Sequence, residues 1–211
     1  MNDQRLKVKL IIMIGRKHFV PVIIIGLLAG LSCNEQSTPR PKGYFNIDLP
    51  EKKYLSFNQP GYPYAFEYPA YGKVMKDSTF FDAAPENPYW VNIEFPDFNA
   101  KIYLSYKEIN AKNNFDLLIK DAFKMTSKHS IKATYIDEIP FKENQGVSGF
   151  IFDVGGNAAT GKQFFATDSS RNFLRGALYF DATPNFDSIQ PAERFLYEDV
   201  LHLIKTLQWK N

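Results

Sequence analysis

Hydrophobic and polar residues alternate in short runs along most of residues 53–182, a pattern that is typical of β-strands. The clearest run lies at 100–107, where every second residue from Ile102 to Tyr106 is apolar. This period of two predicts a strand with one buried face. Other runs, rich in β-branched and aromatic residues and separated by Pro and Gly, predict more strands. With the run above, the expected strands are 44–47, 53–57, 64–68, 90–95, 100–109, 131–141, 146–154, 162–169 and 171–182.

Two segments have the three-to-four-residue spacing of a helix instead. In the first, Asn113 or Asn114 is the expected N-cap, and apolar positions recur from Phe115 onwards. In the second, from about 189 to 208, Pro191 suits an early helical turn. Strands in sequential runs with only two helices predict an α+β fold, an antiparallel β-sheet with two packed helices. This order of elements resembles the PsbP-like α+β sandwich.

The first 32 residues have a different pattern. Residues 5–18 hold five Lys and Arg, and residues 19–31 form an uncharged apolar run. This is the pattern of a secretory signal, and such a run spans only about 20 Å as a helix, less than a hydrocarbon core of about 30 Å. A transmembrane anchor is the alternative interpretation. A start at Met13 would give a shorter leader, so the choice between Met1 and Met13 stays open.

Cys33 is the only cysteine of the chain and follows this apolar run directly. A single cysteine forms no disulfide within the chain and no multi-cysteine zinc site. With Ser32 before it, the cysteine resembles the end of a bacterial lipobox, although Gly30 stands where Leu is usual. We therefore predict that Cys33 is lipidated. An incidental thiol is the alternative.

The domain boundaries follow from this prediction. Residues 1–32 are the expected lipoprotein signal peptide, and residues 33–42 are the lipidated cysteine and a flexible polar tether. Residues 43–211 have the size of a single globular domain. Five of the 25 Lys and Arg and one of the 23 Asp and Glu lie within residues 1–32, which leaves a net charge of −2 for the rest. This balance argues against nucleic-acid binding.

One loop matches a nucleotide-binding motif in part. GNAATGKQ at 156–163 fits G-x-x-x-x-G-K as far as Lys162, but Gln163 stands where the motif needs Ser or Thr for Mg²⁺. The QFFA that follows predicts a strand, whereas a phosphate-binding loop opens a helix. We therefore predict a Gly-rich hairpin turn at this position.

The chain offers few other signals of catalysis. Of the three histidines, His18 lies in the leader, and neither His129 nor His202 has a partner nearby in sequence. Asp137 and Glu138 are neighbours on an expected strand, so their side chains point to opposite faces. We predict no catalytic residue, metal site or cofactor. A hydrolase assembled from distant residues, with His129 or His202 facing a carboxylate, remains a third hypothesis.

Residues 54–72 hold seven aromatic residues and three prolines. The first interpretation is packing, since Tyr64 and the next aromatics alternate along one face of a strand. The alternative is a partner or ligand surface. Its candidate residues are Tyr62, Tyr64, Tyr71 and Tyr89.

Four stretches resemble the gliding motility lipoprotein GldD family of Bacteroidetes: RPKGYFNIDLPEKKY (40–54), FEYPAYG (66–72), NPYWVNIEFP (87–96) and IKTLQWK (204–210). The resemblance covers essentially the whole secreted body. It implies a cell-envelope lipoprotein that the gliding machinery requires, with other gliding-motility lipoproteins, envelope machinery proteins and the linked type IX secretion system as partners. It implies no enzymatic activity, and it carries over one residue, Cys33, as the lipidated position.

These observations lead to two main hypotheses. The first is a structural or assembly component of the gliding machinery. The alternative is a lipid-anchored periplasmic binding module for a small molecule or glycan. Surface-exposed lipoproteins of this phylum often have an acidic cluster after the cysteine, whereas residues 34–42 hold Glu35 alone. We therefore expect an outer-membrane location that faces the periplasm.

Overall fold

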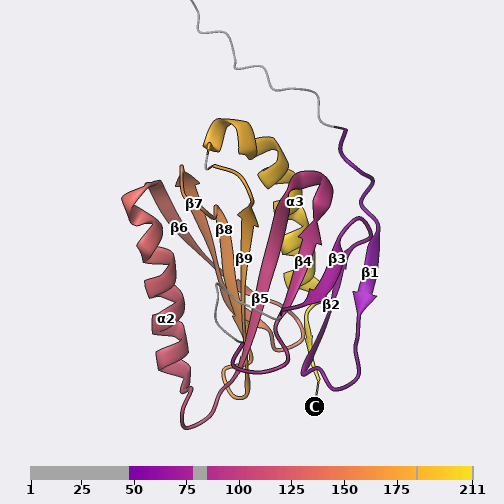
Figure 1. Ribbon diagram of the computed structural model, residues 1–211. Coiled ribbons are helices and arrows are strands. Elements are labelled where there is room, and N and C mark those ends of the chain that lie inside the picture. The colour runs from indigo at the N-terminus through magenta and orange to yellow at the C-terminus, as the bar shows by residue number, and fades with distance from the viewer. Residues whose placement is uncertain (1–47, 78–84, 184, 211) are drawn as a thin grey trace, which may run out of the picture. The chain divides into compact units, whose positions relative to one another are not determined.

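The main element of the fold is an antiparallel sheet of seven strands (Figure 1). The computed structural model describes residues 48–77, 85–183 and 185–210. The strands lie in the order β3-β4-β5-β9-β8-β7-β6, and each neighbouring pair is antiparallel. Their bounds are β3 (Lys73–Lys76), β4 (Val91–Phe95), β5 (Ala100–Glu108), β6 (Ala133–Lys142), β7 (Ser148–Gly156), β8 (Lys162–Thr167) and β9 (Asn172–Phe180).

A second, smaller sheet combines the two ends of the described chain. It has the order β1-β2-β10, with β1 (Tyr54–Phe57), β2 (Tyr64–Pro69) and β10 (Gln208–Trp209). In this sheet Trp209 pairs with Tyr64, and Phe57 pairs with Phe66. The pairing brings the C-terminal residues next to a strand that precedes them by about 140 positions.

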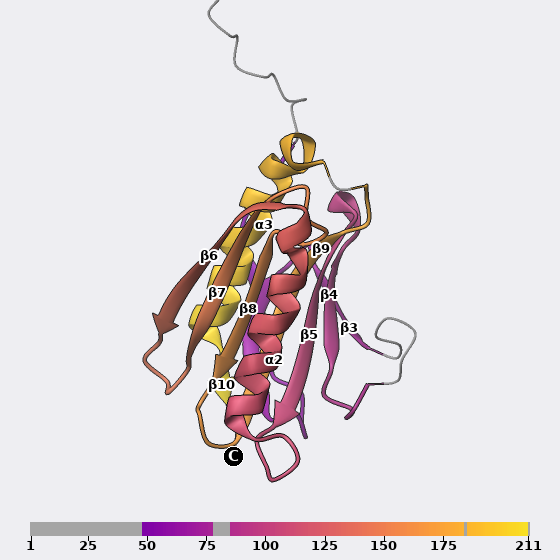
Figure 2. The same ribbon diagram turned by 90° about the vertical axis from the view of Figure 1, so that its left-hand side faces the viewer.

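Helix α2 (Phe115–Ser127) connects β5 to the far edge of the large sheet and covers one of its faces (Figure 2). It begins where the sequence predicts, because the Asn114 side chain accepts a hydrogen bond from the Leu117 backbone N–H at 2.8 Å. Its apolar stripe, with Leu118 and Ala122, packs on phenylalanines of the sheet. A short 3₁₀ helix, η2 (Lys128–Ile131), continues it.

Helix α3 (Phe186–Thr206) covers the opposite face together with the small sheet (Figure 1). Its buried stripe includes Leu196, Val200 and Leu203, as the spacing predicts. The larger hydrophobic core lies between this layer and the inward side chains of β4, β5, β8 and β9. Within the described ranges, no helix is long and apolar enough to cross a membrane.

The predicted α+β class with an antiparallel sheet and two packed helices is confirmed. Several expected boundaries are wrong. Helix α3 begins at Phe186, so Pro191 lies inside it and not near its first turn, and residues 208–209 form β10 instead of helix. The short strands β3 and β10 carry no alternation long enough to predict them, and the expected strand at 44–47 lies outside the described residues.

Candidate functional site

The loop at 156–163 is a hairpin connection, as predicted. Strand β7 ends at Gly156, which has a φ of 95°, and β8 begins at Lys162. No helix follows the lysine, so the loop lacks the helix N-terminus that a phosphate site requires. The lysine instead points into a group of charged side chains between this hairpin and α3.

Lys162 is the centre of this charged group. Asp153 and Lys162 are directly opposite on β7 and β8, so their side chains share one face of the sheet and form an ion pair. The Lys162 Nζ lies 3.9 Å from a Glu193 oxygen and 5.0 Å from the centre of the Tyr197 ring. Two carboxylates and an aromatic ring, contributed by strand β7 and helix α3, therefore surround one ammonium group on β8.

Glu193 is less well satisfied than its neighbours. It is 8% exposed, and among the described residues its one ion pair is with Lys162, at 3.9 Å. Its carboxylate lies directly over Gly161: a Cβ on that glycine would come within 1.7 Å of Oε1. Burial raises the pKa of Glu193, and the nearby Lys162 offsets part of that rise.

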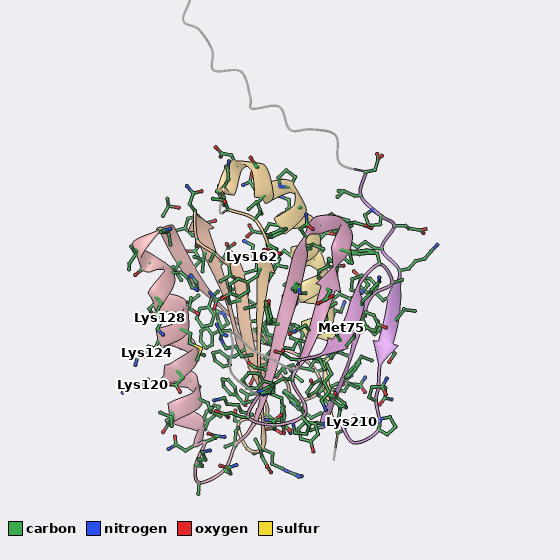
Figure 3. All side chains as sticks on the ribbon, in the orientation of Figure 1. Met75, Lys120, Lys124, Lys128, Lys162 and Lys210 are labelled. Carbon is green, nitrogen blue, oxygen red and sulfur yellow. The ribbon has the colours of Figure 1, made fainter. Side chains whose placement is uncertain are left out.

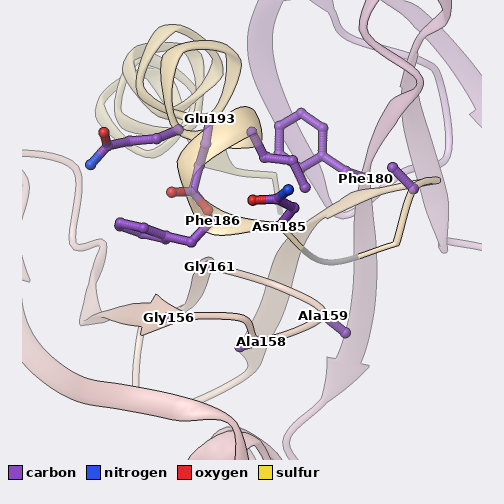
Figure 4. A pocket seen from close by; sticks show the side chains of 11 residues that line it. Gly156, Ala158, Ala159, Gly161, Phe180, Asn185, Phe186 and Glu193 are labelled. Carbon is purple, nitrogen blue, oxygen red and sulfur yellow. The ribbon is translucent and has the colours of Figure 1, made fainter. Parts of the chain in front are cut away.

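Two cavities lie beside this carboxylate, and both are lined by Phe186, Gln190 and Glu193. The smaller, of about 20 Å³, is bounded by the hairpin loop and the first turns of α3 (Figure 4). It has room for about one water molecule. The larger has about 230 Å³ and is also lined by Tyr135, Asp153, Lys162, Arg194 and Tyr197.

A second buried carboxylate, Asp199, lies two turns further along α3 and is 1% exposed. It accepts hydrogen bonds from Lys52 Nζ at 2.8 Å, from the Tyr54 hydroxyl at 3.0 Å and from the Tyr71 hydroxyl. Burial, and then the bond to Asp199, raise the pKa values of both tyrosines. Lys52 also donates to the Phe195 carbonyl at 2.7 Å. This group fastens the start of the described chain to α3.

The structure brings three of the four candidate tyrosines together. Ring centres of Tyr62 lie 5.8 Å from Tyr64 and 5.7 Å from Tyr89, and the Tyr64 hydroxyl donates to the Tyr89 carbonyl. Tyr64 is fully buried, so its ring belongs to the core and cannot contact a ligand. Tyr71 belongs to a different aromatic group, with Phe95, Phe98 and Phe195.

Tyr89 also lines a polar pocket of about 370 Å³. Its other lining residues are Pro63, Glu86, Asn87, Tyr106, Glu108, Asn110, Lys112, Asn113, Arg171, Asn172 and Lys210. The Tyr106 hydroxyl donates to Asn172 Oδ1 at 2.7 Å, and Asn172 donates to Asp168 at 2.6 Å. Burial acts to raise the pKa of Asp168, but hydrogen bonds from the backbone and side chain of Asn172 and from neighbouring backbone N–H groups lower it to about 2.

One histidine faces a carboxylate. His202 Nε2 lies 2.7 Å from Glu67 Oε2, and its ring stacks on Tyr54 with centres 3.5 Å apart. The two side chains are 27% and 45% exposed, so the pair is not buried. Burial and the charge of Arg175 lower the pKa of His129.

The remaining candidates are placed as follows. Asp137 and Glu138 lie on β6 and are exposed. Cys33 lies outside the described residues. In the described part of the chain, no group of three His, Cys, Asp or Glu residues is arranged to hold a metal ion.

The sequence analysis missed the buried charges of α3. Glu193 and Asp199 follow the spacing of the buried stripe that contains Leu196 and Val200. An acidic residue on an apolar stripe is the signal that could have identified them, because an isolated carboxylate is rarely buried without a partner. Their partners come from distant segments and leave no local pattern.

The comparisons with known proteins identify a family and include similar solved structures. The structure is similar to the solution structure of cyanobacterial PsbP (CyanoP) from Synechocystis sp. PCC 6803, with a TM-score of 0.42 and 10% sequence identity over 81% of this chain and 98% of that chain. No curated protein matches the sequence. The family model for the gliding motility lipoprotein GldD matches residues 34–209. The chain therefore belongs to the GldD family of gliding motility lipoproteins.

Proposed function

We propose that this gliding motility lipoprotein acts as a structural or assembly component of the gliding machinery and of the linked type IX secretion system, and not as an enzyme. The family match over residues 34–209 supports a role in motility. The observation that carries the structural role is the use of the buried charges. Asp199 and Lys162 are held by partners within the chain, so they stabilise the fold and are not free to act on a substrate.

The proposed anchor is Cys33, whose acyl chains would hold the protein at the membrane. The family match begins at the next residue, and family membership implies a membrane-anchored protein of the cell envelope. We place the protein at the periplasmic face of the outer membrane, where other gliding-motility lipoproteins and envelope machinery proteins are the proposed partners.

Complementation of a deletion strain tests this function. The wild-type chain is expected to restore gliding and secretion, whereas Cys33→Ala should yield an unlipidated protein that restores neither. Glu193→Gln and His202→Gln serve as matched variants. The first removes the carboxylate, and the second the imidazole, that are best placed for acid–base chemistry, and both keep a similar side-chain volume. Normal motility in both variants supports a structural role. Loss of motility with unchanged protein level and stability in either variant would favour catalysis instead.

The alternative function, a binding module for a small molecule or glycan, is favoured by one observation. The pocket of about 370 Å³ combines polar side chains with Tyr89 and Tyr106, and sugars are bound by aromatic rings and hydrogen-bonding groups. Titration with envelope glycans, followed by tryptophan fluorescence of Trp90 and Trp209, tests it. Saturable binding that Tyr89→Ala abolishes would support this function, and an unchanged signal at millimolar glycan would refute it.

A further inference from the structure

The outer surface of α2 carries one straight line of side chains. Spacings of three and four residues place Leu117, Lys120, Lys124, Lys128 and Ile131 along the same side of the helix and its 3₁₀ continuation. All five are exposed, and Ile131 is 90% exposed. Figure 3 shows the three lysines on the side of α2 that faces away from the sheet. The line spans about 20 Å at 1.5 Å per residue.

The charges on this line are not neutralised within the chain. Across the described residues, the lysines that form salt bridges are 52, 53, 101, 107 and 162, and none of the three on α2. Asp116 and Asp121 lie to either side of the row and form no salt bridge with it in these ranges. Three like charges at intervals of one turn repel one another by a few tenths of a kcal/mol per pair, which is about the size of the attraction that Asp116 and Asp121 offer to the lysines four and three residues after them.

The two ends of the line are apolar. Leu117 lies in the first turn of α2 and is 43% exposed, and Ile131 ends η2. Leu118 and Ala122 pack against the sheet and fix the rotation of α2 about its axis, so Leu117 and Ile131 stay on the exposed side. The exposed side of α2 therefore combines a basic row with one aliphatic side chain at each end. Basic side chains are attracted to anionic headgroups, and aliphatic side chains can enter the headgroup boundary.

We propose that α2 docks lengthwise on an anionic phospholipid surface, with Lys120, Lys124 and Lys128 against lipid phosphates and with Leu117 and Ile131 inserted between the headgroups. The inference rests on the proposed lipid anchor, which holds the body beside a bilayer. Lysine suits this role, because its flexible stem carries a compact point charge that can follow mobile phosphates.

The length of chain before the described body permits this orientation. Asp48, the first described residue, lies fifteen positions after Cys33, and an extended chain of that length reaches about 50 Å. The anchor therefore does not force the end of the molecule that carries Asp48 to face the bilayer. Each lysine near an anionic surface adds about 1 kcal/mol of attraction, so three of them shift docking by about a hundredfold.

Lipid-specific quenching in reconstituted vesicles tests the proposal. The full lipidated chain carries Ser130→Cys, labelled with a polarity-sensitive fluorophore, and lipidation blocks the sulfur of Cys33. Vesicles contain either phosphatidylcholine alone or an equal mixture with phosphatidylglycerol, each with a brominated lipid as quencher. Ser56→Cys on β1, on the other side of the large sheet, is the matched control position (Figure 1).

We expect strong quenching at position 130 and weak quenching at position 56, in the anionic vesicles only, with loss of the difference at high salt. The triple variant K120Q/K124Q/K128Q should weaken docking by about a hundredfold. The control K73Q/K76Q/K205Q, which removes as many exposed charges elsewhere, should dock like the parent.

Two outcomes overturn the docking proposal: equal quenching at both positions, or equal quenching at position 130 in neutral and anionic vesicles. Co-flotation of the chain with vesicles is measured in the same samples. If the chain does not float, the lipid anchor is wrong, and that result is distinct from failure of α2 to dock.

Discussion

Two buried carboxylates on α3, Glu193 and Asp199, differ in what surrounds them. Both belong to the buried side of one helix and are exposed by 8% and 1%. Asp199 accepts from one ammonium and two hydroxyl groups, whereas the nearest cation to Glu193 lies at 3.9 Å beside open cavities. Burial alone therefore does not decide the role of a charged side chain. Asp199 joins distant segments, and Glu193 remains partly unsatisfied.

The largest effect is expected from Asp199→Ala. It leaves the Lys52 ammonium and two tyrosine hydroxyls without their acceptor, and breaking such a buried pair costs about 3–5 kcal/mol. Urea unfolding measures the loss. Glu198→Ala, at a neighbouring side chain that is 65% exposed, is the control and should change stability by less than about 0.5 kcal/mol. Similar losses in the two variants would contradict the assigned role of Asp199.

Gly161→Ala tests how closely Glu193 is held against the hairpin. The added Cβ would lie 1.7 Å from Oε1, so the helix or the loop must shift, at a cost of about 2 kcal/mol. The double variant with Glu193→Ala removes the clash. The changes in unfolding free energy are measured by thermal unfolding in a double-mutant cycle. If the effects of the two substitutions simply add, the carboxylate and the glycine are not in close contact.

Tyr71→Phe isolates one of the donors to Asp199. The change keeps the ring packing and removes a hydrogen bond to a charged group, which costs about 1.5 kcal/mol. Tyr62→Phe is the control, since its pKa is raised by burial alone and Asp199 is not among the causes. Chemical denaturation measures the loss of stability in both variants. A larger loss in Tyr62→Phe than in Tyr71→Phe would show that the hydrogen bond from Tyr71 to Asp199 does not stabilise the fold.

Glu193→Gln should have the smallest effect and the opposite sign. Because its folded pKa is raised, Glu193 contributes stability below its unfolded pKa, and that contribution is lost as pH rises through the folded value. The amide carries no charge to bury. The variant should therefore be more stable than the parent at neutral pH, by up to about 1 kcal/mol, with the advantage shrinking toward pH 4. Melting temperatures across this pH range measure it, and a destabilised variant at neutral pH would mean that Lys162 needs this carboxylate.

Much of the fold follows from local pattern. The alternation in β5 and the cap at Asn114 depend on residues a few positions apart, and both elements form where they are predicted. The hairpin turn at 156–163 was predictable because Gln163 and the following strand fail the requirements of a phosphate loop.

The candidate site was far less predictable. The Lys52–Asp199 and Glu67–His202 contacts join residues 147 and 135 positions apart, and no spacing rule reaches that far. The tyrosine surface shows the same limit. Tyr64 and Tyr89 are both aromatic residues near prolines, yet one is fully buried and the other lines a pocket. Only the packing of β2 against α3 and β10 decides between them.

The Lys52 contacts determine how the body bears mechanical load. If the chain is anchored at Cys33, as proposed above, tension from the anchor would reach Lys52 two residues before β1 begins. There the ammonium bonds to Asp199 and to the Phe195 carbonyl, both on α3. Under that anchor, force would pass directly into a long helix packed on the main sheet, and the four-residue β1 would be spared from being peeled away from β2 one hydrogen bond at a time.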